Sequence, residues 1–160
     1  MTTARRVTFE VFGIPKAKGN AKSFVVQRPG QKPRAITTLD NARSKNWQTV
    51  VADCAQTAAS GMLFVGAVVL TISFVLPRPL KPMSSHHVTL PDIDKLLRAI
   101  LDALTGTVYV DDKQVVELHA RKVYQVHRAA PPGVFIVIED AALPDPLQPQ
   151  LPDCRSLFHG

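Results

Sequence analysis

Cysteine is scarce in this chain, which has only Cys54 and Cys154 among 160 residues. Two cysteines so far apart fit neither the multi-bridge framework of small secreted domains nor the paired spacing of a zinc site. Long apolar runs are also missing, because the longest, around residues 65–75, is interrupted by Thr71 and Ser73 and is too short to cross a bilayer. We therefore expect a soluble protein of a reducing cytoplasm, without a membrane partner.

Acidic residues are nearly absent from the first 50 positions, which hold Glu10 and Asp40 against ten Lys or Arg. The whole chain has 19 Lys and Arg, 13 Asp and Glu, and a formal net charge of +6. A polyanion such as nucleic acid is the natural partner of so basic a half. A merely solvated basic surface is the alternative.

Hydrophobic periodicity predicts four strands and two helices. Apolar residues make up 46% of the chain, enough for the core of one domain. Strands are expected over 7–12, 68–75, 115–126 and 134–139, and helices over 41–60 and 92–105. This β-α-β-α-β-β order predicts an α/β fold: a single two-layer domain with a mixed sheet of about four strands and both helices on one face.

Two segments are predicted to lack regular structure. Residues 13–40 are basic and contain several Gly and Pro, which indicates a long loop. The domain is expected to span residues 1–140, and residues 141–160, rich in proline, are expected to form a disordered tail.

Carboxylates gather in residues 91–116, although the chain is basic. This stretch holds five of the 13 acids: Asp92, Asp94, Asp102, Asp111 and Asp112. Helix capping and turn formation would explain the first two by themselves. The second pair follows a strand-like run, residues 107–110, so the two pairs meet if the helix and strand ends converge. Converging carboxylates require a cation, and oxygen ligands suit Mg²⁺ or Mn²⁺.

The sequence also predicts roles for polar residues on and just before the acidic stretch. Arg98 lies four residues from both Asp94 and Asp102 on one helix face, so an Arg98–Asp102 pair is expected. His86 and His87 point opposite ways if extended, which favours solvated or phosphate-contacting histidines over metal ligands.

The acidic stretch resembles the signature of a known family. It reads Asp-Ile-Asp-Lys-Leu-Leu-Arg-Ala-Ile-Leu-Asp-Ala-Leu-Thr-Gly from residue 92, and then Val-Tyr-Val-Asp-Asp-Lys-Gln-Val-Val from residue 108. Both runs are similar to those of the RusA-like Holliday-junction resolvases. The segment Gly-Ile-Pro-Lys-Ala-Lys-Gly at residues 13–19 is similar to the loop after the first strand of that family.

The resemblance implies a crossover junction endodeoxyribonuclease that is homodimeric, comes from a bacterial cell or prophage, and depends on Mg²⁺, for which Mn²⁺ can substitute. It implies catalytic residues Asp92, Asp94, Arg98 and Asp112, with the three aspartates, and as a second choice Asp111, holding the metal. Two positions depart from the family pattern: Lys95 stands in place of Asn, and Arg98 in place of Lys. An arginine cannot donate a proton at ordinary pH.

The partner implied is branched DNA, above all four-way junctions. The expected phosphate contacts come from Lys16, Lys18, Lys22, Lys81 and Lys95. Two rival functions stay open: a non-catalytic protein that binds branched DNA, and a metal-dependent nucleotide-sugar transferase that uses Asp-x-Asp. The basic first half and the short chain argue against the transferase.

Overall fold

The computed structural model describes residues 4–18, 22–26, 34–38 and 42–142, without side-chain detail for 22–26, 34–38 and 42–45. A four-stranded sheet of order β1-β6-β4-β5 carries the fold. Its strands are β1 (Arg6–Phe12), β4 (Val68–Leu76), β5 (Val115–Tyr124) and β6 (Gly133–Asp140). The helices are α1 (Ala42–Ala59) and α2 (Ile93–Leu104), and a 3₁₀ turn, η1 (Asp112–Gln114), precedes β5. No helix in the described ranges is long and apolar enough to span a membrane.

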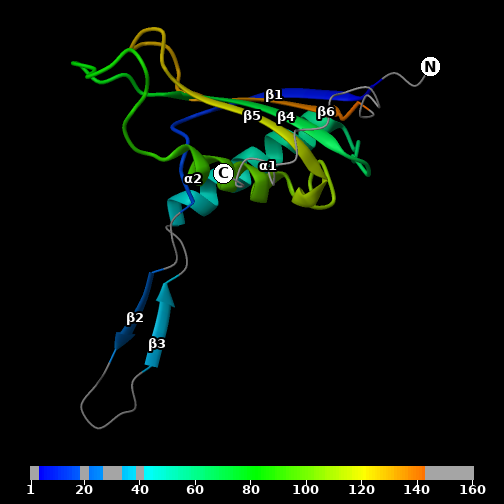
Figure 1. Ribbon diagram of the computed structural model, residues 1–160, viewed down its shortest axis with the longest axis horizontal. Helices are drawn as coiled ribbons and strands as arrows, with labels where there is room; N and C mark the ends of the chain where they lie inside the picture. The colour runs from blue at the N-terminus through cyan, green and yellow to red at the C-terminus, as the bar shows by residue number, and fades with distance from the viewer. Residues whose placement is uncertain (1–3, 19–21, 27–33, 39–41, 143–160) are drawn as a thin grey trace, which may run out of the picture.

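The sheet is mixed because the connections differ. β6 pairs antiparallel with both β1 and β4, whereas β4 and β5 pair in parallel. A parallel pair requires a crossover that returns the chain to the end where it started. The segment between β4 and β5 contains α2, which makes that return, so α2 runs in the direction opposite to β5 (Figure 1). The start of α2 therefore lies near the end of β5, and the end of α2 near its beginning.

Both helices cover the same face of the sheet (Figure 1). α1 packs on α2 and β1, and α2 contacts β5 and η1. Alternate strand residues are buried beneath the helices, as period-two patterns predict. The core includes Val7, Phe9, Val11, Trp47, Val51, Leu70, Ile72, Phe74, Leu96, Ile100, Leu104, Ile136 and Ile138. The predicted two-layer α/β architecture and the order of its four sheet strands and two helices are confirmed.

Two local predictions were wrong. The basic segment expected to be a loop contains a two-stranded antiparallel hairpin, β2 (Lys22–Val26) and β3 (Arg34–Thr38). The strand-like run 107–110 is not a strand, because only Tyr109 forms isolated bridges, with Phe64 and Thr105. The predicted disordered tail beyond residue 142 lies outside the described residues.

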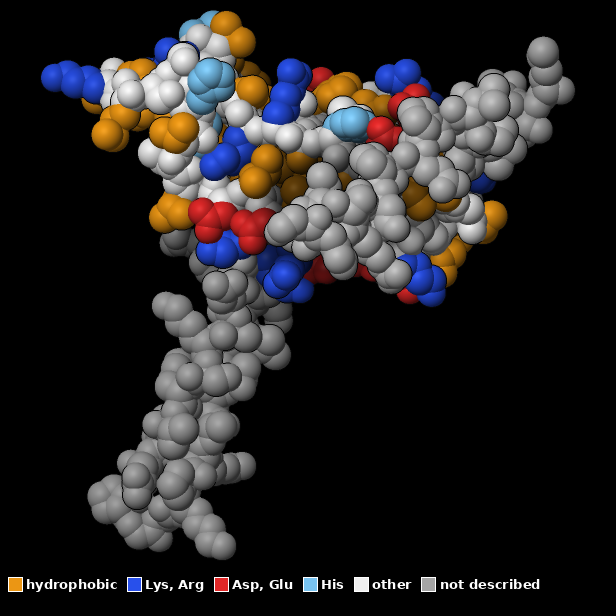
Figure 2. All heavy atoms as spheres, in the orientation of Figure 1, with side chains coloured by type: hydrophobic (Ala, Val, Ile, Leu, Met, Phe, Trp, Pro, Cys, Tyr) orange, Lys and Arg blue, Asp and Glu red, His pale blue; other side chains and the backbone are white. Residues whose placement is uncertain are grey.

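Two loops extend together beyond one end of the sheet (Figure 1). Residues 77–90 follow β4, and residues 125–132 connect β5 to β6. We call these two loops the projection. Apolar, Lys/Arg and His side chains are visible on it, whereas Asp and Glu side chains lie lower on the molecule and along the sheet (Figure 2).

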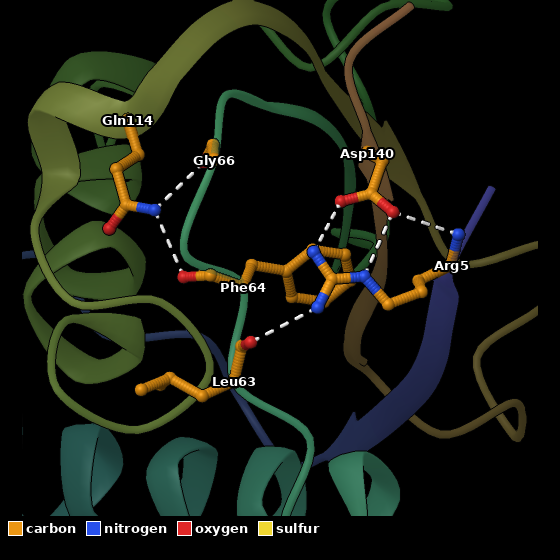
Figure 3. Close-up of polar contacts among 6 residues, drawn as sticks. All are labelled: Arg5, Leu63, Phe64, Gly66, Gln114 and Asp140. Atoms are coloured by element: carbon orange, nitrogen blue, oxygen red, sulfur yellow. Dashed lines mark hydrogen bonds and ion pairs between the residues drawn. The ribbon is translucent and has the colours of Figure 1, made fainter. Parts of the chain in front are cut away.

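An ion pair joins Arg5, just before β1, to Asp140 at the end of β6 (Figure 3). The Arg5 side chain donates from Nη2 to Asp140 Oδ1 at 2.7 Å and from Nε to Asp140 Oδ2 at 2.9 Å. Arg5 also donates to the Leu63 carbonyl at 3.2 Å and lies over the Phe64 ring, 4.8 Å from its centroid. This bidentate contact ties the start of β1 to the end of β6, next to the first pair of their ladder, Arg6 with Glu139.

We expect this pair to make stability depend on pH. Hydrogen bonds from Arg5 hold the pKa of Asp140 below its ordinary value. A lowered folded-state pKa contributes stability above the unfolded-state value and loses it as the pH falls through the folded-state value. Asp140→Asn should therefore lower the free energy of unfolding at pH 7, and the difference from wild type should shrink below about pH 4. Urea unfolding across this range measures it, with Glu10→Gln on β1 as control. A difference that stays constant with pH would refute the assignment.

Candidate active site

The first acidic pair lies at the entrance to α2. Asp92 occupies the N-cap position with extended backbone, yet its side chain makes no capping hydrogen bond. Asp94 lies in the first helical turn, and its side chain is exposed. Helix capping therefore does not account for either carboxylate.

Lys95 adds a positive charge to this pair. Its Nζ donates to Asp92 Oδ2 at 2.6 Å. This hydrogen bond and the charge of Lys95 lower the pKa of Asp92, with a smaller contribution from Lys122. In return Asp92, and more weakly Asp94, raise the pKa of Lys95. Lys95 stands where the family pattern has Asn. Its charge therefore interacts with both aspartates.

Lys122 holds the chain in place just before this pair. It lies on β5, half-buried, and its Nζ donates to the carbonyls of Thr89 and Pro91, both at 2.9 Å. The Leu90–Pro91 peptide bond is cis. In the sequence, Lys122 is a charge that interrupts the apolar alternation of residues 115–126, and this is the signal that could have revealed its anchoring role.

The second acidic pair begins η1, and its two members differ. Asp111 is the N-cap: its Oδ1 accepts from the Lys113 backbone N–H at 3.0 Å, and this bond, with the Lys113 side chain, lowers its pKa. Asp112 is exposed at the first position of the turn. Since Asp111 caps the turn and Asp112 is exposed, the Asp112 carboxylate is the more accessible of the two.

Gln114 fixes this turn against the segment that precedes β4 (Figure 3). Its Oε1 accepts from the backbone N–H groups of Val110 at 2.8 Å and Asp111 at 3.0 Å. Its Nε2 donates to the carbonyls of Phe64 at 2.9 Å and Gly66 at 2.8 Å. One side chain thus satisfies four backbone groups. The glutamine of the Asp-Asp-x-Gln-Val motif therefore has a structural role, which the motif alone did not reveal.

The second pair lies beside the later half of α2. The Tyr109 hydroxyl donates to the Leu101 carbonyl at 3.2 Å. Burial raises the pKa of Tyr109 far above its ordinary value, and the charges of Asp112 and Asp102 add to the rise. The N–H groups of Thr107 and Val108 both donate to the Leu104 carbonyl at 3.0 Å, so the turn that leads into the second pair is anchored at the end of α2. Asp94 precedes Asp102 by two turns of α2, about 12 Å along the axis.

The two acidic pairs thus occupy different ends of the α2 surface. Asp92, Asp94 and Lys95 are grouped at its start, and Asp111 and Asp112 lie near its end. Within the described ranges, no three His, Cys, Asp or Glu side chains gather closely enough to hold one metal ion.

The expected pair between Arg98 and Asp102 does not form. Asp102 instead forms an ion pair with Lys18, whose backbone N–H also donates to the Lys95 carbonyl at 3.1 Å. The loop after β1 packs onto α2 and brings Lys18 to Asp102. Asp102 therefore pairs with Lys18, although Arg98 lies only four residues away on the helix. Among the described residues, no ion-pair partner of Arg98 is found, and its side chain is exposed.

The other predicted DNA contacts are spread over two regions. Lys16, in the loop after β1, borders a hollow of about 250 Å³ with Trp47 and Val50 of α1. Lys81 is exposed on the projection. Lys22 begins β2, and its side chain lies outside the described detail. His86 is exposed, while His87 is buried against the Tyr124 ring at 4.8 Å between centroids.

Comparison with known proteins identifies the family of this chain. The chain is 26% identical over 148 residues to the uncharacterized protein YqaN of Bacillus subtilis (strain 168), an alignment that covers 85% of this chain and 97% of that protein. The family model of endodeoxyribonuclease RusA matches residues 15–139, which include both acidic pairs, α2 and the loop that contains Lys16 and Lys18. Since that match covers most of the sequence, the chain belongs to the RusA family of Holliday-junction endodeoxyribonucleases.

Proposed function

We propose that this protein is a Mg²⁺-dependent endodeoxyribonuclease that resolves four-way DNA junctions by two symmetric nicks, in bacterial DNA recombination and repair. The observation that carries the proposal is the family match over residues 15–139. Mn²⁺ is expected to substitute for Mg²⁺. A bacterial cytoplasm, of a cell or of one that carries a prophage, is the expected location.

The donor chemistry suits a hard divalent cation. Asp92, Asp94 and Asp112 would hold it, since their carboxylate oxygens are the ligands that Mg²⁺ and Mn²⁺ prefer. When bound, such an ion neutralises phosphate charge and activates water for phosphodiester hydrolysis. Because Asp112 lies near the other end of α2, the proposal requires a shift of η1, or a second copy of the chain, to bring that carboxylate to the first pair.

Three cations, two on α2 and one in the loop after β1, would act on the DNA phosphates. Arg98, one turn after Asp94, is exposed, and no ion-pair partner of its guanidinium is found among the described residues. We assign it to the phosphate at the cut, as a fixed cation and not as an acid. Lys95 orients Asp92 and adds a further charge at the same point. Lys16 extends the basic surface along the loop after β1.

Two symmetric nicks require two equivalent active sites, and a two-fold homodimer provides them. The dimer is therefore part of the proposal.

Lys16 and Lys18 should contribute unequally to binding. The Lys18 ammonium is already paired with Asp102, whereas no ion-pair partner of Lys16 is found among the described residues. Lys16→Ala should therefore flatten the plot of log affinity against log salt by about one unit of slope, as expected for one lost phosphate contact. Lys18→Ala, the matched control, should change the slope less. Equal slopes for both variants would show that the Asp102 pair does not persist on DNA.

Synthetic DNA and purified protein distinguish the proposal from its rivals. With Mg²⁺, a mobile four-way junction should give paired nicks at symmetric positions, while a linear duplex of the same sequence stays intact. Binding without nicks would support the non-catalytic junction-binding protein. Hydrolysis or transfer of a nucleotide sugar, without any nicks, would support the transferase.

A further inference from the structure

The projection, residues 77–90 and 125–132, is held at its base by a buried glutamine. Gln125 Oε1 accepts from the Arg78 backbone N–H at 3.1 Å, and the Gln125 backbone N–H donates to the Leu76 carbonyl at 2.9 Å. Its Nε2 also donates to the Ala130 carbonyl. One side chain therefore joins the two loops where they leave the sheet.

Aromatic and basic contacts strengthen this base. The His87 ring packs on the Tyr124 ring, and the Arg78 guanidinium also lies over the Tyr124 ring, 5.7 Å from its centroid. Lys122 binds the carbonyls of Thr89 and Pro91. Pro91 is followed directly by Asp92. The Lys122 hydrogen bonds that support the projection therefore also hold the segment just before the first acidic pair.

The outer surface of the projection combines two kinds of side chain. Its large apolar residues are almost fully exposed, with Met83 at 93%, Val126 at 89% and Leu80 at 78%. Val88 and Leu90 are exposed as well. The two loops contain no Asp or Glu, and they carry Arg78, Lys81, His86, His127 and Arg128. Figure 2 shows apolar, basic and His side chains mixed at this end of the molecule.

Exposed apolar side chains on so positive a surface restrict the choice of partner. Two copies of the projection facing each other would bring like charges together without acids to neutralise them. DNA fits both features: phosphates pair with Lys and Arg, and apolar side chains can insert between bases and unstack them. Bases are easiest to unstack where the continuous stack of a duplex is interrupted, as it is where the arms of a four-way junction meet.

We propose that the projection inserts Leu80 and Met83 into the crossover of a four-way junction, unstacking the bases there while its cations hold the flanking phosphates. This inference rests on the proposed function, because it takes branched DNA as the substrate. It assigns junction selectivity to the projection and leaves phosphodiester chemistry to the carboxylates of α2 and η1.

Base unstacking is measured separately from cleavage by a junction that carries 2-aminopurine at its crossover, with EDTA present. Wild-type protein at saturation should raise the fluorescence by roughly twofold or more, since 2-aminopurine brightens when it is unstacked. The double variant Leu80→Ala, Met83→Ala should lose most of that rise. Both side chains are exposed, so the fold should persist, and Val65→Ala, which removes another side chain exposed at 75%, is the matched control. Lys81→Ala should weaken binding but keep the full rise at saturation.

The outcomes separate this inference from the proposed function. If wild type binds the junction without any rise, or if the double variant keeps the rise, the inference is overturned and the proposed function stands. If wild type does not prefer the junction to a duplex, both fail. If the double variant changes the oligomeric state by light scattering, the apolar surface belongs between two copies of the chain, and the inference is again overturned.

Discussion

Replacing Asp94 with Asn should reduce junction cleavage by on the order of a thousandfold while junction binding persists or becomes tighter. Asn keeps the shape of the side chain but removes the negative charge that a divalent cation requires. The same loss removes a repulsion toward DNA phosphate, so affinity should not fall. Asp94 makes no capping hydrogen bond in α2, whose N-cap is Asp92, so the helix should remain intact. Single-turnover cleavage and binding in EDTA measure the two effects separately.

Asp53→Asn is the matched control for this variant. Asp53 is also an exposed helical aspartate, but it lies in α1. It should cleave as fast as wild type. If Asp94→Asn lost binding and thermal stability together, Asp94 would have a structural role, and its assignment to the active site would be withdrawn.

Replacing Gln114 with Ala should destabilise the protein by about 2–4 kcal/mol, because four backbone groups lose their only described side-chain partner. For a chain of this size the melting temperature should fall by roughly 5–12 °C. Cleavage should fall by more than the unfolded fraction explains, since η1 also carries Asp112. Calorimetry and cleavage at a temperature where the variant is folded measure both effects.

Two further variants sharpen this test. Gln114→Glu keeps the acceptor for Val110 and Asp111 but places a charge against the carbonyls of Phe64 and Gly66, so it should also be unstable. Gln56→Ala, an exposed glutamine of α1, should change stability little. A Gln114→Ala protein as stable as wild type would show that water replaces these hydrogen bonds at no cost.

Local periodicity was sufficient to predict most of the architecture. Buried side chains alternate along Val68–Leu76, which is the pattern of a strand covered on one face. The apolar residues of α2 recur every three or four positions, which is the pattern of a helix. A connection through α2 allows β4 and β5 to pair in parallel, but the sequence did not identify these two strands as neighbours. The membership in the RusA family was also predictable, because the motif on α2 and η1 is contiguous.

Features that depend on contacts distant in sequence were not predictable. Asp102 pairs with Lys18 and not with Arg98, because the loop after β1 folds onto α2. Lys122 and Gln114 bind carbonyls of segments more than thirty positions away in the chain. The hairpin β2–β3 was missed because the Gly and Pro residues around it indicated a loop. Periodicity describes which side of an element is apolar, and it does not describe which backbone groups a polar side chain will reach.

The most direct test of the account is the anomalous scattering of Mn²⁺ in crystals of the protein bound to a four-way junction with uncleavable phosphates. Manganese is expected beside the phosphate to be cut, in contact with Asp92, Asp94 and an Asp112 carboxylate from the same chain or its two-fold mate. Manganese bound to Asp92 and Asp94 with every Asp112 side chain far from it would contradict the account, as would DNA bound to the opposite face of the sheet.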